Sequence, residues 1–177
     1  MSQWNKKNKP TIIVNAVKPD ERHLMDWIIH LTEQFISETK VYSQLGFSSV
    51  KYREYVKMVL EGNDGVCLIA HDGVKAYGYT LFYAENTYIE QTNCEIVTMY
   101  VCPEARGWGV GRALVEETTR IVDANDVAYS QISICGEFEQ DGEMMDMLTE
   151  NLYKKFGFKR MGVILGRKGK SWDLSAK

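Results

Sequence analysis

Proline and low-complexity sequence are scarce in this chain. Only three of its 177 residues are proline, and no Pro/Ser-rich linker, block of like charge or internal repeat divides it. Flexible linkers usually have such compositions, and 177 residues is close to the common size of one domain. We therefore expect a single domain over residues 1–177, with a short flexible basic N-terminus at about residues 1–9.

Long apolar runs are also missing. No stretch approaches the roughly 20 apolar residues that a membrane-spanning helix needs, and the polar start MSQWNKKNKP lacks the apolar core of a secretory signal. The net charge of −3 and the isoelectric point near 5.7 argue against a protein whose main partner is nucleic acid. The sequence thus predicts no membrane partner and disfavours a nucleic-acid partner.

Cysteine is present but has no metal-binding pattern. Four widely spaced cysteines each lie in or beside an apolar run, and none forms a C-x-x-C or a Cys/His pair: Cys67, Cys94, Cys102 and Cys135. We expect buried reduced thiols and no metal. Reduced thiols fit a cytoplasmic protein.

The periodicity that is present alternates between strand and helix. Strand patterns cover residues 11–17, 66–70, 74–85, 94–102, 128–135 and 158–165. Helix patterns follow Asp20, Ser48 or Ser49, the glycines near residue 110, and Asp141. The order β-α-α-β-β-β-α-β-α-β predicts an α/β (α+β) fold: a mixed, mainly antiparallel central sheet of six to seven strands, flanked by about four helices.

Three of these segments have patterns that predict their place in the fold. CEIVTMYVC, residues 94–102, has only Glu95 and Thr98 as polar side chains, which is typical of a central strand covered by helices on both faces. Residues 128–135, AYSQISIC, indicate another buried strand. The last helix should present Met144 or Met145, Leu148, Leu152 and Phe156 on one face and end at Gly157.

A glycine-rich segment, CPEARGWGVG, joins the central strand to the next helix. First-turn amides of a helix have no intrahelical partner and bind anions, and glycines allow a phosphate to approach the backbone. Arg106 directly precedes the glycines and adds a fixed positive charge. A tight strand-to-helix turn explains glycines alone, but the arginine and the buried strand favour a pyrophosphate site.

Three nucleotide-binding patterns compete for this segment. A P-loop needs Lys and Ser/Thr after its last glycine, whereas Arg112 and Ala113 follow Gly111. A dinucleotide fingerprint needs G-x-G-x-x-G, whereas the spacing here is G-x-G-x-G. Glu137, after the next strand, has a place suited to a ribose-binding acid, so the dinucleotide alternative stays open.

The third pattern is a resemblance to a known family. RGWGVG, residues 106–111, resembles the R/Q-x-x-G-x-G/A pyrophosphate loop of the GNAT superfamily of acyl-CoA-dependent N-acetyltransferases. LYKKFGFKR, residues 152–160, is similar to that family's L-Y-x-x-x-G-F helix-to-strand junction. Asp146 and Thr149 replace the Asn and Ala that the family often has before the junction, which puts in doubt a side-chain contact to the pantetheine arm.

The resemblance implies a cofactor and its site. Acetyl-CoA would be the co-substrate, with no metal, and homodimers are frequent in the family. The strand backbone at Met99, Tyr100 and Val101 would bind the pantetheine arm, with the N–H of Tyr100 or Met99 as oxyanion donor. The remaining cofactor-binding residues are those of the loop: Arg106, Gly107, Trp108, Gly109, Val110, Gly111 and Arg112.

Two catalytic residues are predicted. Tyr153, in the junction motif, would be the general acid, since its reference pKa of ~10 suits donation to a departing thiolate. Packing against Phe156 and Phe158 is the alternative role for it. Glu95 would be the base: an acid in an apolar strand costs free energy to bury unless it is paired, and it matches the base of histone-type relatives. A solvent-facing acid, or deprotonation through a chain of waters, is the alternative.

The acceptor would lie between residues 39–47 and the acidic segment 136–146. The carboxylates of segment 136–146 would attract a cationic amine, although a solvated loop has the same composition. We therefore expect an N-acetyltransferase that moves an acetyl group to a primary amine of a small molecule or protein/peptide, by direct transfer through a ternary complex. The alternatives are a non-catalytic acyl-CoA-binding or regulatory protein and, disfavoured by the charge, an acyltransferase that modifies nucleic acid or a nucleotide.

Overall fold

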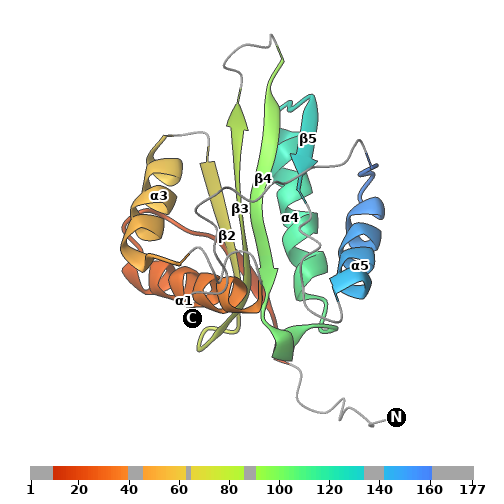
Figure 1. The fold of residues 1–177 in the computed structure, drawn as a ribbon. Coiled ribbons are helices and arrows are strands. Elements are labelled where there is room, and N and C mark those ends of the chain that lie inside the picture. Colours follow the sequence, from red (N-terminus) through yellow and green to blue (C-terminus); the bar gives the residue numbers. More distant parts are fainter. Residues whose placement is uncertain (1–9, 40–45, 63–64, 86–90, 134–141, 161–177) are drawn as a thin grey trace, which may run out of the picture.

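A computed structural model gives the fold and describes residues 10–39, 46–62, 65–85, 91–133 and 142–160. Its strands are β1 (Ile13–Ala16), β2 (Gly65–His71), β3 (Ala76–Glu85), β4 (Asn93–Val101) and β5 (Tyr129–Ile132). Its helices are α1 (Arg22–Glu38), α3 (Ser49–Glu61), α4 (Val110–Ala124) and α5 (Gly142–Lys154), with a 3-10 turn η2 (Pro103–Ala105) before α4. Figure 1 shows this arrangement.

The described strands form one mixed sheet in the order β1-β2-β3-β4-β5. β1 to β4 pair antiparallel, and β5 pairs parallel to β4 after the crossover through α4. This confirms the predicted fold class, with five strands in the described part of the chain instead of six to seven. The expected strand at residues 158–165 has no regular structure over 158–160, and its remainder lies outside the described residues.

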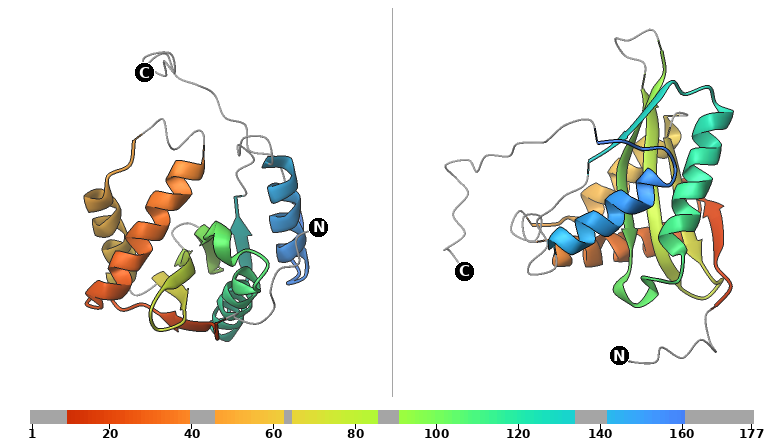
Figure 2. Two further views of the ribbon diagram at one scale, coloured as in Figure 1. Left: turned by 90° about the horizontal axis from the view of Figure 1, so that it is seen from below. Right: turned by 90° about the vertical axis from the view of Figure 1, so that its right-hand side faces the viewer.

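Helices cover the sheet on both faces, α1 and α3 on one and α4 and α5 on the other (Figure 2). The hydroxyl of Tyr79 in β3 meets Thr32 of α1 at 2.8 Å and Tyr52 of α3 at 3.1 Å. Gly78, the preceding residue, faces Val110 and Leu114 of α4. Because side chains alternate along a strand, these two residues identify the two faces of β3.

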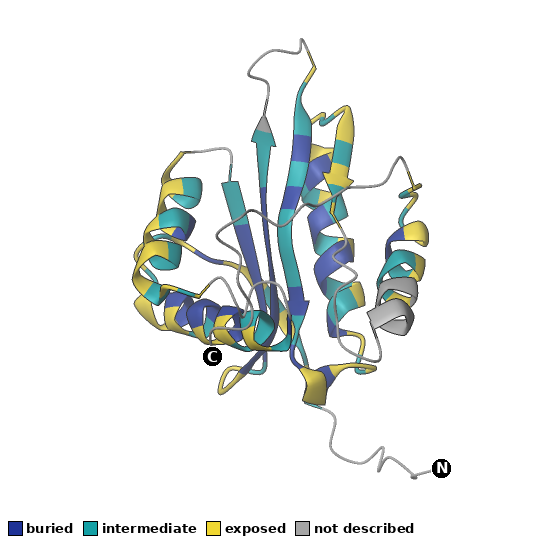
Figure 3. Cartoon of the chain, in the orientation of Figure 1, coloured by how far each residue is buried: buried dark blue, intermediate teal, exposed yellow. Residues whose placement is uncertain are grey.

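The core lies between these layers, and Figure 3 shows buried positions concentrated along β2, β3 and the inner faces of α1 and α4. The three described cysteines, Cys67, Cys94 and Cys102, are free and buried, as the sequence predicts. Burial raises the pKa of Cys94 to about 11, so its thiol is protonated at neutral pH. Cys135 lies outside the described residues.

The helix ends follow the predicted capping residues in part. Ser48 accepts a hydrogen bond from the Lys51 N–H at the start of α3, and Gly62 ends that helix. The expected cap at Asp20 is wrong, since Glu21 occupies the cap position of α1 without a side-chain cap hydrogen bond. The expected cap at Asp141 lies outside the described residues.

Two burial predictions are wrong. Residues of β5 alternate between exposed and half-buried, because β5 pairs only with β4 in the described part of the chain. Leu148, expected on the packed face of the last helix, is 53% exposed, whereas Leu152 and Phe156 pack against the core. Among the described residues, no helix is long and apolar enough to span a bilayer, and no three His, Cys, Asp or Glu side chains gather as a metal site would require.

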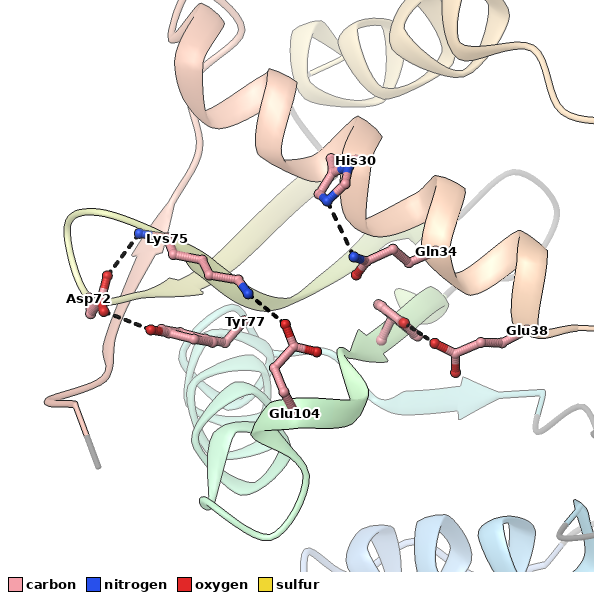
Figure 4. A network of polar contacts seen from close by, with 8 residues as sticks. His30, Gln34, Glu38, Asp72, Lys75, Tyr77 and Glu104 are labelled. Atoms are coloured by element: carbon pink, nitrogen blue, oxygen red, sulfur yellow. Dashed lines mark hydrogen bonds and ion pairs between the residues drawn. The ribbon is translucent and has the colours of Figure 1, made fainter. Parts of the chain in front are cut away.

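The β2–β3 hairpin is held by one carboxylate. Asp72 accepts hydrogen bonds from the N–H groups of Val74 and Lys75 and from the Tyr77 hydroxyl (Figure 4). These bonds lower the pKa of Asp72 to about 2. Lys75 also pairs with Glu104 of η2 at 2.5 Å, which ties the hairpin to the segment that precedes the glycines.

Candidate active site

The glycine segment forms the connection from β4 to α4. Gly107 and Gly109 have φ angles of +81° and +90°, a left-handed backbone that other residues rarely adopt. Gly109 is the N-cap residue of α4 and has no side chain to satisfy the first amides of that helix. These amides are therefore available to an anion, as the sequence predicts for a pyrophosphate.

Gly111 has a different role. A Cβ atom there would lie 3.3 Å from Leu152 of α5 and 3.6 Å from Val101 of β4. The glycine therefore lets α5 approach the first turn of α4 closely. The alternative explanation for the loop glycines, a tight strand-to-helix turn, thus applies to Gly111.

Arg106 does not extend its side chain freely from the loop. Its guanidinium donates to the Glu38 carboxylate at the end of α1, at 2.5 Å, and its Nε donates to the Val101 carbonyl at 3.1 Å. The Tyr100 hydroxyl donates to the other oxygen of Glu38, also at 2.5 Å. The Arg106 guanidinium, which the sequence predicts to bind a phosphate, is thus paired with a carboxylate of the protein in this structure.

The second edge of β4 is open over the stretch predicted to bind the pantetheine arm. β5 pairs with β4 only from Asn93 to Ile96, and no described strand lies against Val97–Val101 on that side. Figure 1 shows β5 beside only part of the length of β4. On the other side Leu81 pairs with Thr98 and Phe82 with Ile96, which leaves Val97 as a β-bulge where the β5 pairing ends. The Cys102 N–H donates to the Tyr77 carbonyl, so by alternation along the strand the N–H and C=O of Tyr100 point to β3, and those of Met99 and Val101 point to the open side. Since the Val101 carbonyl accepts from Arg106, the Met99 backbone and the Val101 N–H are the groups left to pair with another extended chain.

Tyr153 of α5 lies against this open stretch. It is only 2% exposed, and its hydroxyl donates to the Met99 sulfur at 3.2 Å. Burial raises the pKa of Tyr153 above its usual value, so the phenol keeps its proton at neutral pH. Its ring also contacts Phe158 edge-on, at 5.1 Å between centroids, so the alternative packing role is present as well.

Glu95 lies on the opposite face of β4. It pairs across the sheet with Tyr83, whose hydroxyl donates to its carboxylate at 3.1 Å. Tyr83 and Tyr79 are four residues apart in β3, so their side chains lie on the same face of the sheet. This is the face that α1 and α3 cover, since Tyr79 contacts both helices. Glu95 is half-buried and paired, as an acid in an apolar strand requires.

The two predicted catalytic side chains therefore lie on opposite faces of β4, Tyr153 beside the open stretch and Glu95 within the stretch that pairs with β5. Tyr153 reaches Met99 from the α4–α5 side, and Glu95 lies on the α1–α3 side. Glu95 and Met99 are four positions apart along β4, about 13 Å at ~3.3 Å per residue. Glu95 would therefore need a chain of waters to accept a proton from a group at Met99.

Sequence reasoning missed several residues of this region. Glu38 is separated by 68 residues from Arg106, and nothing in its own segment marks it as an ion-pair partner. Tyr83 lies in a predicted strand, and Tyr52 and Tyr55 lie in a predicted helix, but the sequence patterns predict no functional role for them. For Tyr83 the register of β3 against β4 is the missing information, because that register alone sets it opposite Glu95.

Comparisons with known proteins agree with this geometry. Residues 63–160, just over half of the chain, match the family model described as "Acetyltransferase (GNAT) domain". A search of curated proteins gives no significant match.

Solved structures of similar fold include several acetyltransferases. An aminoglycoside acetyltransferase from an uncultured soil metagenomic sample has 17% identity and a TM-score of 0.68, with 90% of this chain and 99% of that chain covered. Aminoglycoside N-acetyltransferase AAC(6')-Iy, in complex with CoA, has 11% identity and a TM-score of 0.68, with 93% and 98% covered. Ribosomal-protein-alanine N-acetyltransferase from Brucella melitensis biovar Abortus 2308 has 14% identity and a TM-score of 0.61, with 90% and 100% covered. At these identities the similarity concerns the fold.

A mixed sheet with an open strand edge, followed by a glycine connection into a helix, is the architecture of an acetyltransferase. The matched family model covers both the open edge and the glycine connection. The chain belongs to the GNAT acetyltransferase family, which confirms the resemblance seen in the sequence.

Proposed function

We propose that this protein is an N-acetyltransferase that transfers an acetyl group from acetyl-CoA to a primary amine within a ternary complex. The observation that best supports this is the open edge of β4, with the Tyr153 hydroxyl on one face and the Glu95 carboxylate on the other. The neighbouring folds include enzymes named for amine acetylation, one of them in complex with CoA.

The described residues fit the parts of acetyl-CoA. The uncapped start of α4, with Trp108 to Arg112, would hold the pyrophosphate through backbone amides. The Met99 backbone and the Val101 N–H, which face the open edge, would pair with the amides of the pantetheine arm as an added strand does. Of the two oxyanion donors predicted from the sequence, Met99 is the one whose N–H faces that edge, so it would donate to the thioester oxygen.

The chain's own side chains account for the two proton movements. Glu95, through a chain of waters, accepts the proton that the ammonium must lose before its nitrogen attacks the acetyl carbon. The new C–N bond forms as the C–S bond breaks, and Tyr153 gives its proton to the departing sulfur. Burial raises the pKa of Tyr153, so at neutral pH the phenol has a proton to give.

Ligand-dependent thermal stability tests the donor half of the proposal. A ligand that binds only the folded state raises the unfolding temperature, so acetyl-CoA should stabilise the protein and NAD and ATP should not. Gly109→Glu should abolish the acetyl-CoA effect, because it adds bulk and negative charge at the pyrophosphate. Gly73→Glu is the matched control: its φ of +91° gives the same backbone strain in the β2–β3 hairpin, and it should keep the response.

Turnover tests the acceptor half. Thiol release from acetyl-CoA in the presence of a panel of primary amines should exceed release without amine. Acetyl-CoA binding without turnover of any amine would instead support the non-catalytic acyl-CoA-binding alternative. Stabilisation by NAD in place of acetyl-CoA would favour the dinucleotide alternative.

A further inference from the structure

Three tyrosines gather near Glu95 on the α1–α3 face of the sheet. Tyr83 of β3 donates its hydroxyl to the Glu95 carboxylate. Tyr55 of α3 contacts Tyr52 ring to ring, and its pKa is raised by burial first and by the negative charge of Glu95 second. The Tyr52 ring lies 6.1 Å from the Tyr55 ring, and the Phe47 ring lies 5.7 Å from Tyr52. Glu95 with Tyr52, Tyr55 and Tyr83 is called the tyrosine site below.

Tyr52 is held in place by a directed chain of hydroxyl groups. The Thr32 hydroxyl donates its single hydrogen to the Ile28 carbonyl, at 2.7 Å, so Tyr79 must donate to Thr32. Tyr52 must then donate to Tyr79, at 3.1 Å. Since each hydroxyl has one hydrogen, the Tyr52 oxygen has only lone pairs left for a further hydrogen bond.

The tyrosine site adjoins the open stretch of β4. Tyr79, the hydrogen-bond partner of Tyr52, pairs across the sheet with Tyr100 of the stretch that β5 leaves unpaired, and Glu95 comes two residues before that stretch begins. All four side chains of the site are half-buried, so solvent reaches them. A molecule in contact with these rings would therefore lie next to the edge at which the acetyl group is transferred.

The charge of the site is a single negative one. Among the described residues, Glu95 has no cationic partner, whereas Glu38, the other carboxylate near this face of β4, is paired with Arg106. Tyrosine rings attract an ammonium group to their faces, and they also pack against apolar carbon. One carboxylate among rings suits one ammonium on an apolar body, and the described residues of the site offer a polycation no second anionic contact.

We infer that the tyrosine site binds the acceptor, and that this acceptor is a monoamine whose single ammonium is attached to an aromatic or alkyl body. The inference rests on the proposed function and narrows its substrate class. The ammonium lies near Glu95 and the open stretch of β4, and the apolar body packs against Tyr55 and Tyr52. Polycationic amines, including aminoglycosides and polyamines, are then poorer substrates.

Steady-state kinetics with three acceptors tests this inference: phenethylamine as the arylalkyl monoamine, spermidine as the polyamine and kanamycin as the aminoglycoside. We expect kcat/KM for phenethylamine to exceed that for either polycation by at least tenfold. Tyr55→Leu should raise KM for phenethylamine about tenfold, whereas Tyr55→Phe keeps the ring and should stay near wild type. Met58→Leu, at a residue 63% exposed on the same helix, is the matched control.

The outcomes separate this inference from the proposed function. Turnover of spermidine or kanamycin in preference to phenethylamine would overturn the inference and leave the N-acetyltransferase intact. An unchanged KM for phenethylamine in Tyr55→Leu would also overturn it, provided that acetyl-CoA still stabilises the variant as it does wild type. Failure of all three amines and of the wider panel, with acetyl-CoA bound, would overturn both.

Discussion

The Arg106 guanidinium donates to the Glu38 carboxylate at 2.5 Å, although the two residues belong to the glycine connection and to the end of α1. The ring of Tyr100 lies between these elements, with its hydroxyl on Glu38 and its face 6.0 Å from the guanidinium carbon. The arginine therefore compensates a carboxylate that ends a helix, where the helix dipole disfavours negative charge. This ion pair thus links the glycine connection, on the acetyl-CoA side of the site, to the end of α1. That helix leads into residues 39–47, which are predicted to contact the acceptor.

Arg106→Gln should therefore affect stability and the acceptor more than the cofactor. The side chains of Arg106 and Glu38 are 34% and 26% exposed, and loss of their charged hydrogen bond should cost about 1–2 kcal/mol in the free energy of unfolding. The dissociation constant of acetyl-CoA should change less than threefold, while KM for the amine rises. Urea unfolding, calorimetry and steady-state kinetics measure the three quantities.

Arg120→Gln is the matched control for this variant. Arg120 and Glu117 form an ion pair on α4 in which the arginine side chain is 65% exposed, so its loss should cost much less stability than loss of the Arg106–Glu38 pair. If Arg106→Gln instead weakens acetyl-CoA binding tenfold or more while stability is unchanged, the arginine turns to the phosphate on binding, as the sequence pattern alone indicated.

Tyr153→Phe should reduce kcat and leave the fold intact. The described partner of its hydroxyl is the Met99 sulfur, a weak acceptor, so removal of the oxygen should cost little stability. Loss of a general acid typically reduces the rate by 10²–10⁴-fold. The KM for acetyl-CoA should stay near wild type. A kcat within threefold of wild type would assign Tyr153 a packing role beside Phe158.

The sequence was sufficient to predict the elements that depend on local chemistry. Alternation of apolar residues predicted the central strand, Ser48 and Gly62 marked the ends of α3, and the glycine spacing predicted a bare connection into α4. These features arise from neighbouring residues, so a single sequence contains them. The free edge of β4 followed only from the family resemblance.

The rest depends on contacts between distant segments. The pairing of Arg106 with Glu38, and of Tyr83 with Glu95, requires knowledge of strand register and helix placement. Burial of β5 was wrongly predicted for the same reason, since an apolar run does not reveal how many neighbours a strand has. Side-chain partners of site residues are thus the part of the site that sequence patterns predict least well.

Gly78→Ala should destabilise the protein strongly despite its small size. A Cβ atom at Gly78 would lie 2.6 Å from the Tyr100 carbonyl oxygen and 3.1 Å from Val110. Relief of this clash must move β4 or α4, which should cost about 1–3 kcal/mol and weaken acetyl-CoA binding. Gly62→Ala, where the nearest atom is 3.3 Å away and φ is −73°, should cost much less in the same urea titration. Equal losses in the two variants would contradict the close approach at Gly78.

Alkaline pH should destabilise the protein through its buried phenols, and Tyr79 provides the sharpest test. Burial raises the pKa of Tyr79 well above its ordinary value of 10. Below pH ~10 the folded and unfolded states are both protonated, so the full stability is present; above it the unfolded state loses the proton first, and the free energy of unfolding falls as pH rises. Tyr79→Phe removes this titration, so its free energy of unfolding should fall less steeply between about pH 9 and 11.

At neutral pH the variant should be about 1–3 kcal/mol less stable, because the Thr32 and Tyr52 hydroxyls lose their partner. Urea unfolding at a series of pH values measures both effects, with Tyr129→Phe, at a residue 43% exposed, as the control. Parallel pH profiles for wild type and Tyr79→Phe would show that other groups account for the alkaline loss.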